Sequence, residues 1–321
     1  MFDVLLTLGG GLLLYLGAEW LVKGSAGLAR HLGVPPLLVG LTVVAYGTSA
    51  PEAIVTIQGS LGGYGALAAG NIVGSNIANL GLILGLAVVL RPAPHEPGLV
   101  GREVPVLLGS SALLIAALAN GALGRWEGLA LLLGAVVYSV WMVRSAQAER
   151  RSDAADHAAE EGAETAGAPP GTRVVRLTVL LAVGLVMVVT GGHLLVKGSV
   201  GLARALGLSE RIIGVTLVAV GTSLPELATS ALAALRGHSA LAVGNVVGSN
   251  IFNVLLCLGV AGTAAPFALP EGAPWTDLIA MGALTLLAAV AFLRPRPLGR
   301  ALGWTFLAAY GVFLAWTFGV R

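Results

Sequence analysis

One cluster of polar residues occurs twice in this chain, at a constant separation of 174 positions. The segment GTSAPE at 47–52 returns as GTSLPE at 221–226, and GNIVGSNIAN at 70–79 returns as GNVVGSNIFN at 244–253. Each copy places a glutamate, Glu52 or Glu226, inside a long apolar stretch. A carboxylate in the hydrocarbon of a membrane is costly and marks a functional site. Two carboxylates related by duplication predict the two halves of one ion site.

The composition is that of an integral membrane protein. Hydrophobic residues make up 56% and charged residues 11% of the 321 positions, whereas a soluble domain has about 25% charged residues. The net charge of +2 comes from basic residues in loops and gives no signal for nucleic-acid binding. The single cysteine, Cys257, excludes an intrachain disulfide and a cysteine-rich metal site. The predicted partners are the lipid bilayer and small ions, and no obligatory protein partner is implied.

Ten apolar stretches approach the length of about 20 residues that a membrane span needs. They lie at 3–22, 36–61, 66–90, 102–121 and 126–144, and at 174–196, 210–235, 239–264, 275–293 and 300–319. Over 21–52, 20 of 32 positions are identical to the residue 174 further on. Five crossings in the first half place the second half in the membrane upside down. The predicted fold is therefore an all-α integral membrane protein, with ten transmembrane helices in two inverted five-helix repeats.

The two repeats are separated by a polar segment. Residues 145–173 contain no leucine, isoleucine or phenylalanine, which predicts a loose linker. The predicted organisation is a first repeat at 1–144, this linker at 145–173 and a second repeat at 174–321. Five lysines and arginines lie on the side of the amino terminus and thirteen on the other side. By the positive-inside rule, both termini are expected outside a cell (plasma) membrane and the linker in the cytoplasm.

The spacing of the polar residues predicts two helical faces in each repeat. In the first motif the spacing is i, i+3, i+4 and i+7, and in the second it is i, i+4 and i+8, so each set shares one face of a helix. Pro51 and Pro225 lie directly before the two glutamates and should break the helices there, freeing backbone carbonyls. The first repeat contributes Ala45, Thr48, Ser49 and Glu52 with Asn71, Ser75 and Asn79, and the second contributes Ala219, Thr222, Ser223 and Glu226 with Asn245, Ser249 and Asn253.

These groups are carboxylates, hydroxyls, amides and loose carbonyls, and neither motif contains histidine or cysteine. Such hard oxygen ligands suit calcium or sodium and suit soft transition metals poorly. The charge of −2 from Glu52 and Glu226 balances one divalent or two monovalent cations. The pattern therefore predicts calcium competing with sodium, or with protons, for one set of oxygens. No enzymatic catalysis and no cofactor are indicated. Glu19, four residues before Lys23, is interpreted as an interfacial residue.

The doubled motifs resemble the alpha repeats of the sodium/calcium exchangers, within the calcium:cation antiporter superfamily. The resemblance covers essentially the whole chain. It implies electrogenic exchange of sodium for calcium by alternating access. It also implies that spans 2, 3, 7 and 8 form an ion-carrying core across which the long spans 1 and 6 slide.

The resemblance also implies a set of ion ligands. Members of the family can have an aspartate where this chain has Asn253, so the neutral Asn253 amide removes a potential third charge and leaves the site two-fold symmetric in sequence. The proton-coupled branch usually has a glutamate soon after the Gly-Asn of its second motif. No acid follows Asn71 or Asn245, which favours sodium coupling. The implied ligands are Thr48, Ser49, Glu52, Ser75 and Asn79 of the first repeat, Thr222, Ser223, Glu226, Ser249 and Asn253 of the second, and the carbonyls of Ala45 and Ala219.

Three alternatives remain open at this stage. The nearest is a proton/calcium antiporter of the same fold. A gated cation channel is the second, because broken helices and oxygen ligands also make selectivity filters. The third is an intramembrane metalloenzyme, although the sequence has neither a histidine-rich zinc site nor paired aspartates.

Overall fold

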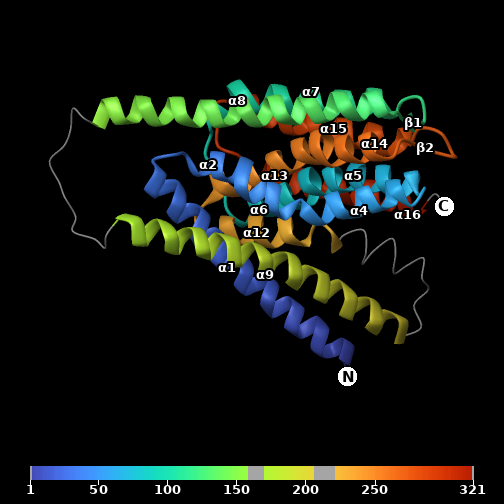
Figure 1. The fold of residues 1–321 in the computed structure, drawn as a ribbon, viewed down its shortest axis with the longest axis horizontal. Coiled ribbons are helices and arrows are strands. Elements are labelled where there is room, and N and C mark those ends of the chain that lie inside the picture. The colour runs from blue at the N-terminus through green and yellow to red at the C-terminus, as the bar shows by residue number, and fades with distance from the viewer. Residues whose placement is uncertain (1, 158–169, 206–220, 320–321) are drawn as a thin grey trace.

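The computed structural model describes residues 2–157, 170–205 and 221–319. This part of the chain is almost entirely helical, and Figure 1 shows long helices that run side by side. The helices are α1 (Phe2–Leu32), α2 (Pro36–Val39), α3 (Ala45–Thr48), α4 (Ala50–Leu61), α5 (Gly65–Ala78), α6 (Gly85–Leu90), α7 (Val104–Leu118), α8 (Arg125–His157), α9 (Pro170–Ala205), α12 (Leu224–Leu235), α13 (Ser239–Phe252), α14 (Gly259–Ala264), α15 (Trp275–Leu293) and α16 (Arg300–Gly319).

Short π-helical segments join several of these helices into longer rods. They lie at Gly40–Val44, Asn79–Leu84, Leu99–Glu103 and Asn253–Leu258. The segments that begin at Asn79 and Asn253 occupy equivalent positions of the two repeats. A π-helical turn contains an extra residue, which rotates the side chains that follow it about the helix axis. Such π-helical segments are frequent at functional sites. Both coincide with positions that the sequence predicts as ion ligands.

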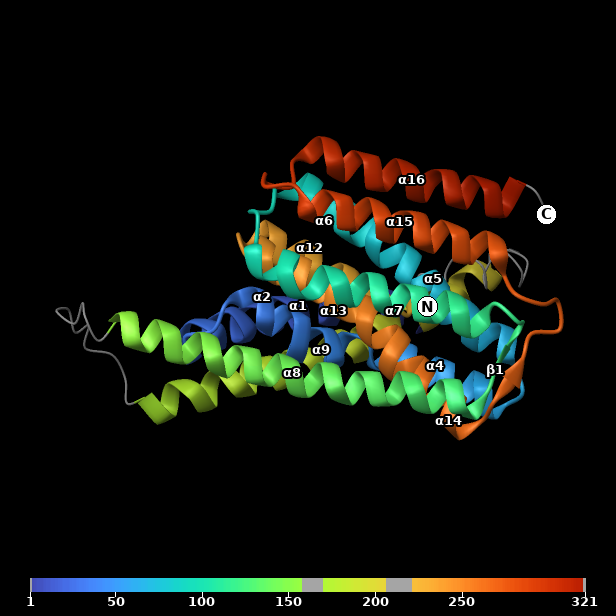
Figure 2. The same ribbon diagram turned by 90° about the horizontal axis from the view of Figure 1, so that it is seen from above.

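Seven helices of the described part are long and apolar enough to cross a membrane. The rod Pro36–Thr48 and helix α4 form an eighth span if the bend of 44° between them lies within one crossing. The predicted span at 210–235 lies partly outside the described residues, and only Leu224–Leu235 of it is seen as a short apolar helix. Helix α16 occupies the predicted tenth span, at the edge of the molecule in Figure 2, but it is not among the seven.

Several boundaries differ from the prediction, two of them by ten residues or more. Helix α1 continues ten residues beyond position 22, to Leu32, although Lys23 and Arg30 lie on that extension. Helix α8 continues through 145–157, so the expectation of a loose linker is wrong for these residues. Charged side chains at a span end interrupt hydrophobicity but do not interrupt helical backbone hydrogen bonds, since alanine, arginine and glutamate all favour helix.

The two rods that carry the second motifs are the most buried. Within an apolar 18-residue window of each span, 78% is buried in Gly65–Leu90 and 94% in Ser239–Ala264, against 28% in Arg125–Ser145. Gly248 of α13 packs against α2–α3, where a Cβ would lie 2.6 Å from the Leu41 carbonyl. The core is thus built around the helices that carry Ser75, Asn79, Ser249 and Asn253.

Helices α1 and α9 form a separate antiparallel pair beside this core (Figure 1). Gly17 of α1 lies against Gly184 and Val188 of α9, and a Cβ on Gly17 would approach the Val188 nitrogen to 2.7 Å. Close backbone approach through small residues is a common way for helices to associate in membranes. The pair contacts the core through α2 and α12.

Two short strand pairings tie loops together. Strand β1 (Ala122–Leu123) pairs antiparallel with β2 (Phe267–Ala268), with Leu123 opposite Phe267. An isolated antiparallel bridge joins Ala93 to Leu298. Ala93 and Phe267 are equivalent positions of the two repeats, so a similar loop contact recurs with the repeats exchanged.

Candidate ion-binding site

The helix breaks place the two glutamates. Ser49 and Ser223 have non-helical backbone angles, with φ −79° and ψ 5° at Ser49 and φ −88° and ψ 8° at Ser223. A proline follows two residues later, in the first turn of the next helix, as the sequence predicts. Glu52 and Glu226 therefore lie in the first turns of α4 and α12, where the helix dipole favours a negative charge. Both are fully buried.

Each glutamate is bound by the serine of the other repeat. The Ser223 hydroxyl donates to Glu52 Oε1 at 2.9 Å, and the Ser49 hydroxyl donates to Glu226 Oε1 at 3.1 Å. The Ser75 hydroxyl makes a longer contact of 3.4 Å with Glu52 Oε1. The two carboxyl groups are near enough to interact electrostatically. The duplicated motifs are thus brought together into one site.

The second oxygen of each carboxylate makes no hydrogen bond in the described part of the chain. Glu52 Oε2 and Glu226 Oε2 are buried and have no hydrogen-bond partner among the described residues. Two further ligand atoms predicted from the sequence, Ser249 Oγ and Asn79 Oδ1, are buried without a partner in the same part of the chain. Ser249 lies beside the Glu226 carboxyl group. Buried polar atoms are normally hydrogen-bonded, so such a group of oxygens in one core fits a site for a hard cation.

The threonines of the first motif bind asparagines of the opposite repeat. Thr48 donates to Asn245 Oδ1 at 3.2 Å, and Thr222 donates to Asn71 Oδ1 at 3.4 Å. These bonds tie the two broken helices to the central rods. The amides of Asn71 and Asn245 are therefore engaged in holding helices together, while Thr48 and Thr222 each retain acceptor lone pairs for an ion.

The threonines and asparagines form a hydrogen-bonded frame that includes two further residues, Thr56 and Ser230, which were not predicted from the sequence. Asn71 Nδ2 donates to Thr56 Oγ1 at 2.9 Å, and Asn245 Nδ2 donates to Ser230 Oγ at 2.9 Å. Thr56 and Ser230 lie four residues after Glu52 and Glu226, which places them on the face of the glutamates. A hydroxyl-bearing residue four positions after the glutamate in both repeats is the sequence signal that identifies Thr56 and Ser230.

The remaining predicted ligands differ between the repeats. Asn79 and Asn253 are both fully buried. Asn253 Nδ2 donates to Asn76 Oδ1 at 3.1 Å, whereas the Asn79 amide has no partner among the described residues. Ala45 is fully buried, and its carbonyl accepts the Ser49 N–H at 3.1 Å, which leaves one lone pair. Ala219 lies outside the described residues.

An apolar cavity of about 420 Å³ approaches the site between α4, α9 and α12. Its lining includes Pro51, Thr222 and Pro225 beside the two helix breaks, and His193 of α9. Thr222 also belongs to the hydrogen-bonded frame, so the cavity reaches the edge of the candidate ion site.

The comparisons with known proteins agree with this geometry. The family model described as sodium/calcium exchanger protein matches residues 2–144 and 176–319. The chain belongs to the sodium/calcium exchanger family. This exchanger is therefore a cation/calcium antiporter by family and a membrane protein with several apolar spans.

Relatives of this exchanger match nearly its whole length. It is 39% identical to the putative antiporter CaxA of Alkalimonas amylolytica, over 87% of this chain and 86% of that one. It is 35% identical to the inner membrane protein YrbG of Escherichia coli, over 97% and 95%. The sodium/calcium exchanger MaX1 of Methanosarcina acetivorans is 30% identical over 89% of each chain.

Solved structures of the sodium-calcium exchanger NCX_Mj are similar in fold to this exchanger. The structure soaked with 10 mM Na+ and no Ca2+ aligns with a TM-score of 0.84 and 32% identity, over 98% of each chain. The structure soaked without either ion also gives 0.84, over 100% of this chain and 99% of that one.

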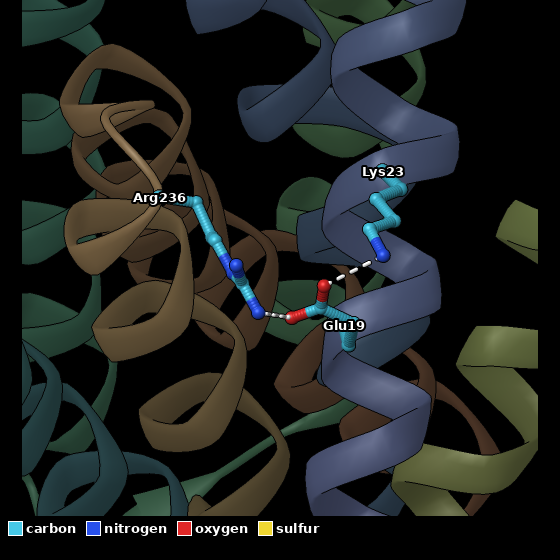
Figure 3. Close-up of polar contacts among 3 residues, drawn as sticks. All are labelled: Glu19, Lys23 and Arg236. Carbon is cyan, nitrogen blue, oxygen red and sulfur yellow. Dashed lines mark hydrogen bonds and ion pairs between the residues drawn. The ribbon is translucent and has the colours of Figure 1, made fainter.

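Away from the ion site, Glu19 of this exchanger joins α1 to the core (Figure 3). Its Oε1 lies 2.7 Å from Lys23 Nζ and its Oε2 lies 2.5 Å from Arg236 Nη2, at the end of α12. Only about 10% of the Glu19 side chain is exposed. The interpretation of Glu19 as an interfacial residue paired along its own helix missed Arg236, because a contact between repeats leaves no local pattern.

Proposed function

We propose that the chain is a secondary active antiporter that exchanges Na+ for Ca2+ across the plasma membrane by alternating access. The single observation that carries this proposal is the pair of buried glutamates. Each is bound through one oxygen by a serine of the opposite repeat and keeps its other oxygen free of hydrogen bonds among the described residues. Carboxylate, hydroxyl and amide oxygens in one buried cluster are the ligands of a hard cation. The transported ions are the substrates, and no cofactor or enzymatic step is proposed.

The proposed ligands are the predicted set. The two glutamates would supply the charge, and the hydroxyls would complete a shell of oxygens that Ca2+ or Na+ can share. Since two carboxylates balance one divalent or two monovalent ions, occupancy by calcium and by sodium would be mutually exclusive. The set comprises Thr48, Ser49, Glu52, Ser75, Asn79, Thr222, Ser223, Glu226, Ser249 and Asn253, with the carbonyls of Ala45 and Ala219.

Ten spans in two inverted repeats are part of the same proposal. Helices α1 and α9 occupy equivalent positions of the repeats and pack antiparallel, which supports an inverted arrangement. The loop contacts at Leu123–Phe267 and Ala93–Leu298 are also related by exchange of the repeats. With the bias of basic residues, we propose that both termini lie outside and that 145–173 lies in the cytoplasm as a linker between the repeats 1–144 and 174–321.

Sodium coupling is favoured over proton coupling by the residues beside the second motifs. No acid follows Asn71 or Asn245, and both amides bind hydroxyls of the frame. The sodium/calcium exchangers MaX1 and NCX_Mj are relatives that cover most of this chain, whereas the name of CaxA states no counter-ion.

The test is calcium flux in proteoliposomes with the driving gradient varied. We expect radioactive calcium to enter sodium-loaded vesicles when external sodium is low, and entry to stop when the sodium gradient is removed at constant pH. Uptake driven by a pH gradient without sodium would identify the proton/calcium antiporter instead. Uptake that follows the calcium gradient at channel rates without any counter-ion would refute exchange.

A further inference from the structure

A second cavity lies at the opposite end of α12 from Glu226. It has a volume of about 430 Å³ and is enclosed by the turn between α12 and α13, the loop after α6 and the start of α2. None of the predicted ion ligands lines it. It is lined by Pro36, Arg91, Pro92, Ala93, Pro94, Gly237, His238, Ser239, Ala240 and Pro297.

Basic groups gather at this cavity without acidic partners. Arg91 and His238 line it, and Arg30 at the end of α1 lies near enough to His238 to interact electrostatically. The Arg91 guanidinium lies over the turn, 3.3 Å from the position of a Cβ on Gly237. Among the described residues, no ion pair or side-chain hydrogen bond joins any of the three to a carboxylate. Arg30 and Arg91 bring two positive charges near His238, and an anion bound in the cavity would be attracted to both.

The start of α13 adds uncharged donors to the same cavity. No side chain caps this helix of 14 residues, and its first residues, Ser239 and Ala240, line the cavity with backbone N–H groups that have no intrahelical partner. Ser239 is 94% buried, and its hydroxyl has no hydrogen-bond partner in the described part of the chain. Helix amino termini with a free hydroxyl and a neighbouring arginine are a common arrangement for phosphate.

The electrostatics of the cavity also fit an anion. Burial and the charges of Arg30 and Arg91 lower the pKa of His238, so without a ligand its imidazole is held neutral. The adjoining small cavity contains Glu96, beside His95 and Arg296. Burial raises the pKa of Glu96, against a smaller opposing effect of His95. A bound anion would favour the protonated form of His238 and gain a further donor.

We propose that this pocket binds a phosphoryl group, with Arg91, His238, Ser239 and the amino terminus of α13 as its donors. The group is either the headgroup of an anionic lipid or free phosphate. Basic pockets between transmembrane helices are sites where lipid headgroups bind. The neighbouring Arg236 bonds Glu19 of α1, so an occupant would stabilise the turn through which α1 is held to the core. This proposal does not depend on which ions the protein transports.

Binding is measured as an increase in the thermal unfolding midpoint of the purified full-length protein. This measurement does not require transport activity. The protein is reconstituted in phosphatidylcholine vesicles, with and without phosphatidylglycerol, and is separately titrated with inorganic phosphate. The variants are Arg91→Gln and Ser239→Ala. The matched control is Arg294→Gln, which removes an exposed arginine at the nearby end of α15 that does not line the pocket.

We expect phosphatidylglycerol or phosphate to raise the midpoint of unfolding of the wild type and of Arg294→Gln alike. Arg91→Gln should raise the half-saturating concentration of the ligand roughly tenfold, as expected for a lost charge-assisted hydrogen bond. Ser239→Ala should raise it by a smaller factor. A response to phosphatidylglycerol alone identifies a lipid headgroup, and saturation by phosphate alone identifies the free anion. An equal loss of this stabilisation in Arg91→Gln and Arg294→Gln, or no stabilisation of the wild type by either compound, would contradict the proposal that this pocket binds a phosphoryl group.

Discussion

The crossed serine–glutamate contacts of the candidate ion site occur in both repeats, whereas the contacts at the ends of α1 and α9 differ between the repeats. At the ion site the repeats present the same residues and exchange the same hydrogen bonds, Ser49 to Glu226 and Ser223 to Glu52. On α1, Glu19 is bound by Arg236, but the position equivalent to Glu19 is His193 and the position equivalent to Arg236 is Gly62, so the same carboxylate–guanidinium pair cannot form there. The crossed serine–glutamate bonds are thus shared equally by the repeats, whereas the attachment of the α1–α9 pair to the core is not.

This difference has a physical consequence for the proposed alternating access. Two inverted repeats with identical contacts would give inward- and outward-facing conformations of equal free energy. An ion pair present at only one end stabilises the conformation that contains it. In this structure the Glu19 end is joined by ion pairs, while His193 lines a cavity that reaches Thr222. We infer that the duplicated motifs of the core set which ions bind and that the unequal ends set which side the site faces.

The largest effect should come from removing either carboxylate. Glu52→Gln and Glu226→Gln each leave a divalent ion beside one buried charge, and we expect near-complete loss of calcium transport by the folded protein in both. Calcium uptake into proteoliposomes measures this, with the exposed Glu127→Gln as the control. Wild-type exchange in one of the two variants would break the equivalence of the repeats.

The crossed serines should give smaller and equal effects. Ser49→Ala and Ser223→Ala each remove one hydrogen bond to a buried carboxylate, which is worth roughly 1.5–3 kcal/mol, or about tenfold or more in calcium affinity. Titration of calcium-dependent uptake would show this as matched shifts in half-saturation. A large shift in one variant and none in the other would show that the two crossed bonds are not functionally equivalent.

The ion pair at the end of α1 should affect conformation and leave calcium affinity nearly unchanged. Arg236 is half exposed, so Glu19→Gln or Arg236→Gln should cost about 1 kcal/mol, a factor of about five between two conformations. Val55 lines the cavity near Thr222. Val55→Cys, combined with either variant, should react more slowly with an impermeant thiol reagent than Val55→Cys alone.

His193→Gln provides the comparison for that experiment. No ion pair among the described residues involves His193, so labelling at position 55 should keep its rate in this variant. If His193→Gln slows labelling as much as Glu19→Gln does, the ends of α1 and α9 are energetically alike, and the proposed difference between them is wrong.

The smallest effect concerns Asn253. Its amide binds Asn76, while the equivalent Asn79 has no partner in the described chain. Asn253→Asp adds a third carboxylate near two others, so protons should compete more effectively with calcium. We expect exchange to persist but to be inhibited by milder acid than in the wild type, as measured by calcium uptake against pH. Coincident pH profiles would assign Asn253 to helix packing.

Much of the site was predictable because the repeat itself carries the information. Pro51 and Pro225 locate the helix breaks, since proline removes a backbone donor wherever it occurs. The spacing of the polar residues located the faces that meet. The predicted span at 275–293 coincides with α15, because its limits are set by hydrophobicity alone.

Other features depend on contacts that no local pattern records. The sequence did not show which repeat supplies the serine to each glutamate, since both arrangements satisfy the same spacing. The pairing of Glu19 with Arg236 joins residues 217 positions apart. The extension of α1 to Leu32 was missed because hydrophobicity ends at Lys23 while helical hydrogen bonding continues.

The most direct test of a single site built by both repeats is the stoichiometry of calcium binding. Isothermal titration of the purified wild type, Glu52→Gln, Glu226→Gln and the double variant would measure it without transport. We expect either single substitution to abolish tight binding and the double substitution to add nothing further, because residues of one site act as a unit. Half of the wild-type stoichiometry with unchanged affinity in each single variant would show two independent sites and contradict the shared one.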